Sequence, residues 1–255
     1  MRRLAYLAAP FALTTVLLGV WEVACRALDV PAYFLPPPSA VAVALAENFP
    51  TLLAAAGRTL WTALVALALA SVIAQALALL TALSPFLDRA IRPLASVVQV
   101  TPVIALAPLV LIWAGLDHPE RALVALALVV AFFPIFSGAA AGLRSADPDL
   151  ERLFDLYGAK PWQRVLRLRL PAAVPFLLEG HMGGAGLALI GAVVAEFGAG
   201  SGQVNGLAWQ ILDAGNKLQT ARMIAALVVL GAMGVALHAA LEAVERAGLR
   251  WWRGR

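Results

Sequence analysis

Long stretches without a charged residue dominate the chain. Five of them, at 4–21, 59–87, 93–116, 122–143 and 223–241, each hold 18 or more residues. A sixth run, at 182–195, reaches a similar length when it is extended back to residue 174. A helix of about 20 apolar residues crosses roughly 30 Å of hydrocarbon, whereas a transmembrane barrel needs alternating strands of about 10 residues. The pattern therefore predicts six transmembrane helices.

Composition supports a membrane protein and excludes several other classes. Hydrophobic residues make up 62% of the chain and charged residues 13%, against roughly 45–50% and about 25% in soluble domains. An ordinary soluble fold and a disordered chain are both excluded. Cys25 is the only cysteine, which excludes a disulfide scaffold. The expected fold class is all-α and integral to the membrane.

The distribution of Lys and Arg predicts the orientation. With the N-terminus placed in the cytoplasm, 14 of the 19 Lys and Arg residues fall on the cytoplasmic side, as the positive-inside rule requires. Both termini are then cytoplasmic. The first span is expected to stay uncleaved, because Trp21 and Glu22 stand where a signal peptidase needs small residues. The positive charges are spread over four segments, so no nucleic-acid partner is expected.

Two outer connections carry local signals. Pro36, Pro37 and Pro38 predict a stiff extended stretch. Ser39 is expected to cap a short helix over 41–49 that lies along the outer interface, although a plain connector fits as well. A second short helix is expected over 207–212. The glycine-rich stretch 198–202 does not end in the Gly-Lys-Ser/Thr of a phosphate loop, so it predicts no nucleotide site.

The loop 144–170 has the most specific pattern in the chain. Asp147 followed by Pro148 is typical of a helix start, and Gly158 is typical of a helix end. Pro161 can begin a second short helix. The pattern places on one apolar face Leu150, Leu153, Phe154 and Tyr157. This helix–glycine–helix elbow favours contact with another protein, and the alternative is an amphipathic segment that lies flat on the bilayer.

The elbow and several other stretches resemble one known family. The elbow sequences are Asp147-Pro148-Asp149-Leu150, Tyr157-Gly158-Ala159 and Leu170-Pro171-Ala172-Ala173-Val174-Pro175. They resemble the EAA loop of bacterial ABC importer permeases. Matches to the nitrate/taurine/sulfonate branch of these permeases include Leu35-Pro36-Pro37-Pro38-Ser39-Ala40-Val41, Thr101-Pro102-Val103-Ile104, Ile112-Trp113-Ala114-Gly115 and Ala195-Glu196-Phe197. One departure is that Arg152-Leu153-Phe154 stands where the family has Glu-Ala-Ala.

The resemblance implies a multi-pass inner-membrane subunit of a type I importer, with six helices in the ABC transmembrane type-1 arrangement. The implied division is an N-terminal span and connector over 1–53, the permease domain over 54–245 with its cytoplasmic loop at 144–171, and a basic tail over 246–255. The implied partners are cytoplasmic ATPase subunits, a second permease chain (a homodimer is expected) and a periplasmic or surface-tethered binding protein. ATP and Mg²⁺ would belong to the ATPase, so no cofactor, metal or catalytic residue is expected on this chain. The residues expected to contact the ATPase are Leu150, Leu153, Phe154, Tyr157, Gly158, Ala159, Pro161 and Trp162.

Candidate pathway residues are few. Gln99, Thr101 and Pro102 open the third predicted span, where proline breaks the helix ladder; the stretch lines the route or is a structural kink. The family position of Glu196 implies a part in the outer gate or in contact with the binding protein. Glu179 and His181 are interpreted as interfacial residues on nearly opposite faces of the fifth helix. The small residues expected to let helices approach closely are Gly138, Gly142, Gly180, Gly184 and Ala188.

Two other functions are considered. An ion-coupled secondary transporter usually has carboxylates at mid-membrane and an internal repeat, and neither is evident in the spans. A membrane enzyme needs His, Asp or Glu clustered at one depth, and His118, His181 and His238 are scattered. The family resemblance favours a small anion such as a sulfonate, taurine or nitrate, with a thiamine-precursor-type ligand as the alternative.

Overall fold

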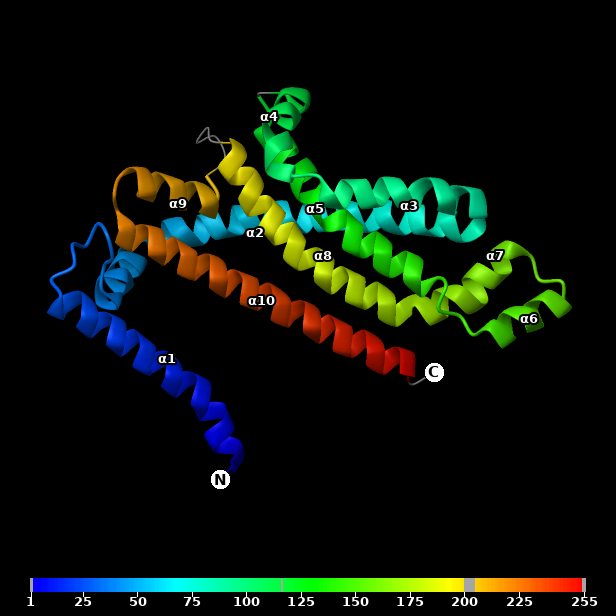
Figure 1. Cartoon of the computed structure of the whole chain (residues 1–255), viewed down its shortest axis with the longest axis horizontal. Coiled ribbons are helices and arrows are strands. Elements are labelled where there is room, and N and C mark those ends of the chain that lie inside the picture. Colours follow the sequence, from blue (N-terminus) through cyan, green and yellow to red (C-terminus); the bar gives the residue numbers. More distant parts are fainter. Residues whose placement is uncertain (1, 116, 200–204, 254–255) are drawn as a thin grey trace.

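The computed structural model describes residues 2–115, 117–199 and 205–253, with the side chains of 11–115, 117–198, 205–250 and 252. Within these ranges the chain is helical and contains no strand (Figure 1). The first half holds α1 (Arg2–Ala27), α2 (Pro38–Leu83), α3 (Pro85–Val100), α4 (Val103–Ala114) and α5 (Pro119–Gly142). The second half holds α6 (Pro148–Leu156), α7 (Pro161–Arg164), the π-helical turn η1 (Val165–Arg169), α8 (Leu170–Ala199), α9 (Leu207–Asn216) and α10 (Thr220–Arg253).

The all-α membrane class is confirmed. Four helical segments of the described chain are long and apolar enough to cross a membrane, and the bent pair of α3 and α4 adds a fifth if it is counted as one span. The predicted count of six is not reached among the described residues. The remaining predicted span, at 4–21, falls on α1, and the side chains of residues 4–10 in it lie outside the described ones.

The third predicted span is sharply bent, so the structural kink considered for Thr101 and Pro102 is present. The chain bends by 102° between α3 and α4. Thr101 and Pro102 are both extended at this bend, with ψ of 126° and 99°. Proline has no N–H for the helix ladder and keeps the preceding residue out of the helical region. Pro102 therefore ends α3 and starts α4 in a new direction.

Several predicted helix ends were wrong. The connector at 41–49 is not a separate helix but the first part of the 46-residue α2, which continues through Pro50. Ser39 does not cap it; its N–H and its hydroxyl donate to the Glu22 carboxylate, at 3.0 and 2.8 Å. Helix α8 likewise continues through Pro175, and α10 runs on to Arg253 through most of the expected tail. A proline removes one ladder bond, and long apolar helices packed on their neighbours tolerate that loss.

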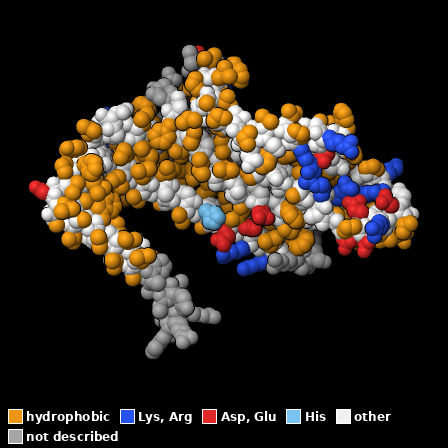
Figure 2. Space-filling view, viewed as in Figure 1, with side chains coloured by type: hydrophobic (Ala, Val, Ile, Leu, Met, Phe, Trp, Pro, Cys, Tyr) orange, Lys and Arg blue, Asp and Glu red, His pale blue; other side chains and the backbone are white. Residues whose placement is uncertain are grey.

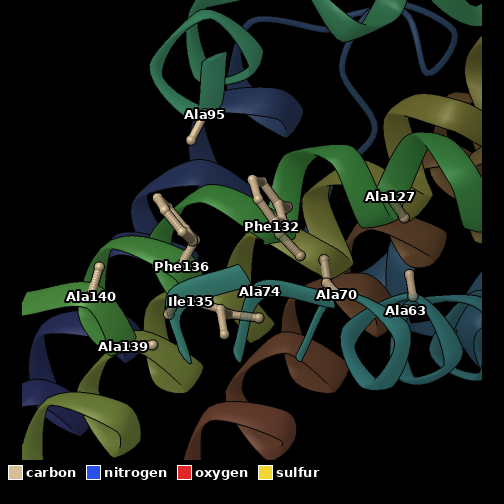
Figure 3. Close-up of a cluster of buried hydrophobic side chains, with 14 of the residues drawn as sticks. Ala63, Ala70, Ala74, Ala95, Ala127, Phe132, Ile135, Phe136, Ala139 and Ala140 are labelled. Atoms are coloured by element: carbon tan, nitrogen blue, oxygen red, sulfur yellow. The ribbon is translucent and has the colours of Figure 1, made fainter. Parts of the chain in front are cut away.

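Helices α5 and α8 form the centre of the molecule and make its most extensive contact. Their interface consists of small residues: Gly138 lies against Gly180, and Gly142 lies against Ala173. Gly184 lies against Ile135, while Ala188 is buried in the main core. Alanines of α2 also pack against α5, in the cluster that contains the stacked rings of Phe132 and Phe136 (Figure 3). Small residues let these helices approach closely, so backbone contacts replace bulky side chains in the core.

The two ends of the bundle differ (Figure 1). Helices α6 and α7 project at one end, near the turn between α2 and α3, and α9 lies at the other end. Helix α1 diverges from the bundle and contacts mainly the start of α2. Figure 2 shows Lys, Arg, Asp and Glu gathered at the α6–α7 end, whereas hydrophobic side chains cover most of the rest of this face.

Candidate functional site

The elbow follows the local signals in its sequence. The Asp147 carboxylate accepts a hydrogen bond from the N–H of Asp149 at 2.8 Å, and Pro148 is the first residue of α6. Gly158 has a φ of +64°, a left-handed conformation that glycine adopts without a steric penalty. Pro161 begins α7. The predicted helix–glycine–helix elbow is therefore present.

The elbow exposes a set of large apolar side chains to solvent. Tyr157 is 83% exposed, Leu156 is 84% exposed and Trp162 is 52% exposed. Leu150 and Leu153 are also exposed, whereas Phe154 and Ala159 are half-buried. Sequence analysis missed Leu156, which is not one of the i, i+3, i+4 and i+7 positions counted from Leu150. A contiguous apolar surface of this kind on a short helix, surrounded by charge, is typical of a protein contact.

Ion pairs tie the elbow to the base of the bundle. Arg169 in η1 donates to the Glu151 carboxylate of α6 at 2.6 Å and to the carbonyl of Ala82 in α2 at 3.0 Å. Arg164 pairs with Asp155 at the end of α6. The guanidinium of Arg169 thus joins α6 and α2 close to the start of α8.

A cavity of about 640 Å³ lies between the α3–α4 bend, α5 and α8. Its polar lining residues are Gln99, Ser137 and Glu179, and its apolar ones include Phe133, Phe176 and Leu187. Of the predicted pathway residues, Gln99 lines this cavity. Thr101 and Pro102 form the bend between the lining residues Gln99 and Val103 and are not themselves part of the lining.

Glu196, near the end of α8, does not line this cavity and lies beside the start of α9. Its carboxylate is 3% exposed and accepts hydrogen bonds from the Thr59 hydroxyl at 2.7 Å and from the N–H of Ala208 at 2.9 Å. The Thr59 hydroxyl accepts in turn from the N–H of Leu207, at 2.9 Å. Glu196 and Thr59 therefore accept from two buried N–H groups that have no partner within α9, and they attach this helix to α2 and α8. Sequence analysis gave no signal for Thr59, which is 137 residues away from its partner.

Glu179 and His181 lie on different sides of α8, as their spacing predicted. The Nε2 atom of His181 is 2.7 Å from the Ser71 hydroxyl of α2, while Glu179 lines the cavity. The interfacial interpretation of the two residues stays a prediction. Ser71 lies 13 residues before the turn at Ser84, which is about 20 Å of helix. His181 is therefore inside the bundle, where the α2–α8 contact provides its polar partners.

An apolar bundle with an exposed elbow at one end, and a cavity between its helices that holds three polar side chains, is the arrangement expected of a polytopic transport subunit. The chain belongs to the family described as the binding-protein-dependent transport system inner membrane component, which it matches over residues 67–248. It is accordingly a multi-pass protein of the inner membrane and an ABC importer permease.

The chain is similar to curated permeases over nearly its full length. It is 32% identical to the formylaminopyrimidine transport permease protein of Halalkalibacterium halodurans, over 92% of both chains. It is 28% identical to a probable ABC transporter permease protein of Haemophilus influenzae, over 91% of this chain and 93% of that one. It is also 28% identical to the taurine transport system permease protein of Escherichia coli, over 92% and 86%.

Proposed function

We propose that the chain pairs with a second copy of itself to form the membrane pathway of an ATP-driven importer of a small polar solute. A binding protein delivers the solute at the α9 end, and separate ATPase subunits bind ATP and Mg²⁺ at the elbow end. The elbow end is cytoplasmic in this proposal, because it carries the arginine-rich segment 144–169 and the charged surface seen in Figure 2.

The observation that carries the proposal is the exposed apolar surface of the elbow. Tyr157 and Leu156 are each more than four-fifths exposed on a short projecting helix, which is unfavourable for a surface that faces water alone. A groove on an ATPase subunit would cover them. Arg169 would then pass movement of α6 to α2 and to α8, which lines the cavity.

The pairing of two chains is supported by the α3–α4 segment. Exposed apolar side chains occur along both helices, including Leu94, Val100, Ile104, Ile112 and Trp113. Helix α4 turns sharply away from the direction of α3 and packs on α5 and α8 with one side only (Figure 1). A second copy placed against this segment would cover these side chains and close the cavity, whose lining includes Gln99 and Val103 from this bend.

Purification of the tagged chain from native membranes in mild detergent tests the proposal. The wild type is expected to co-purify with a P-loop ATPase. Tyr157→Asp is expected to recover at least about tenfold less of the ATPase, because the substitution would bury a charge in an apolar contact. Leu218→Asp is the matched control, since Leu218 is 69% exposed beyond α9 at the opposite end. Equal recovery of the ATPase with Tyr157→Asp and the wild type would contradict docking at the elbow.

A further inference from the structure

The charge inside the cavity restricts the chemistry of the solute. Among the described residues that line it, Glu179 is the one charged side chain, and Gln99 and Ser137 supply the other polar groups. None of these described lining residues is Lys or Arg. A carboxylate in the lining favours a hydrogen-bond donor or a positive group of the solute next to it.

Glu179 has no role in holding the fold together. It is exposed to the cavity and has no hydrogen bond or ion pair with any described residue. Its neighbour Gly180, in contrast, is buried against α5. Glu179 lies near the middle of the helical segment Pro161–Gly198, 18 positions after its first residue and 19 before its last. An ionisable side chain within a membrane-crossing helix is costly unless it serves a pathway, and this one points into a cavity without a partner.

Two arginines line a neighbouring cavity and are paired with an aspartate. A smaller cavity of about 170 Å³ shares Phe133 and Ser137 with the large one and is lined by Arg92 and Arg144. Arg92 binds the Asp88 carboxylate at 2.7 Å, and Arg144 lies 3.6 Å from it. Both guanidinium groups therefore face the Asp88 carboxylate, and neither arginine forms an ion pair with Glu179.

We propose that Glu179, assisted by Gln99 and Ser137, recognises an amino or ammonium group of the solute inside the permease cavity. An N–H donor on the solute gives the carboxylate the charge-assisted hydrogen bond that the protein does not provide. The cargo is then an amine or an amino-substituted heterocycle. This inference rests on the proposed function, because the cavity matters for recognition only if solute passes through it.

Saturation-transfer NMR on the purified permease–ATPase complex, without binding protein, tests this recognition directly. Two pairs of probes differ only by an amino group: taurine against ethanesulfonate, and 4-aminopyrimidine against pyrimidine. In each pair the amino compound is expected to bind at least about tenfold more tightly. Glu179→Gln is expected to remove this difference, because the amide keeps the shape of the side chain but loses its charge. Glu47→Gln, at an exposed carboxylate that does not line the cavity, is expected to keep it.

Equal binding within both pairs, or an unchanged preference in Glu179→Gln, would overturn the inference. Failure of the proposed function would be seen separately, as a purified chain with no ATPase attached. Binding of the probes requires only the folded cavity, so it is measured whether or not the ATPase is present. Size-exclusion profiles of both variants that match the wild type show that the substitutions leave the fold intact.

Discussion

Gly158 controls the direction in which the elbow points. Its φ of +64° lies in the left-handed region, and a Cβ atom there would meet no other atom within 4 Å. Backbone conformation is therefore the sole reason for glycine at this position. For a residue with a Cβ atom, this left-handed backbone conformation costs about 1–2 kcal/mol.

We expect Gly158→Ala to weaken docking of the ATPase. A cost of about 1 kcal/mol lowers the ratio of elbows in the native direction to elbows in other directions about fivefold. Gly158→Asn is expected to lose less, because asparagine tolerates positive φ. The measurement is the ratio of ATPase to permease after purification from membranes. An alanine variant that retains more ATPase than the asparagine variant would show that backbone strain does not govern the contact.

Single residues are predictable from the sequence where their partners are close along the chain. Asp147 and Gly158 follow rules for helix ends that involve neighbours two or three residues away, and both were predicted. Ser39 was wrongly assigned as a cap, because its partner is Glu22 on α1, 17 residues earlier. The pairing of Glu196 with Thr59 spans 137 residues and depends on the packed helices. No local pattern contains that information.

At the scale of helices, the contact between α5 and α8 depends on glycine. A Cβ atom on Gly138 would lie 2.8 Å from the carbonyl oxygen of Phe176 and 3.0 Å from the Cα of Gly180. Both are backbone atoms, which cannot move aside without separating the helices. A Cβ atom on Gly186, also in α8, would meet nothing within 4 Å.

Gly138→Ala is accordingly expected to destabilise the protein by about 1–3 kcal/mol. Gly186→Ala is the matched control and is expected to be neutral or slightly stabilising, because alanine is the better helix former. Thermal unfolding in detergent, followed by tryptophan fluorescence, measures both. Equal unfolding temperatures for the two variants would show that α5 and α8 can move apart to fit the added methyl group without a loss of stability.

Helix existence was more predictable than helix shape. The uncharged runs located the segments that form α2, α5, α8 and α10, because hydrophobicity alone decides which segments enter a membrane. The size of the 102° bend after Val100 was not predicted. Thr101 and Pro102 indicated a possible kink, but the angle follows from packing of α4 against α5 and α8. The continuation of α8 through Pro175 has the same origin, since neighbouring helices decide whether a proline ends a helix.

At the scale of the whole molecule, the elbow and the cavity are joined by one continuous helical segment. The run from Pro161 to Gly198 begins at the elbow, passes the cavity at Glu179 and ends beside α9 at Glu196. We expect movement of the elbow to reach the cavity and the opposite end along this segment. This arrangement fits a transporter in which ATP hydrolysis at one end drives solute across the membrane.

The energy source for transport is the most direct test of this account. The purified complex, reconstituted in vesicles with its binding protein, is supplied with solute and either ATP or an ion gradient. The account predicts accumulation with ATP and Mg²⁺, loss of accumulation with a non-hydrolysable ATP analogue, and no accumulation with a proton or sodium gradient alone. Accumulation driven by an ion gradient in the absence of ATP would contradict the account and favour a secondary transporter.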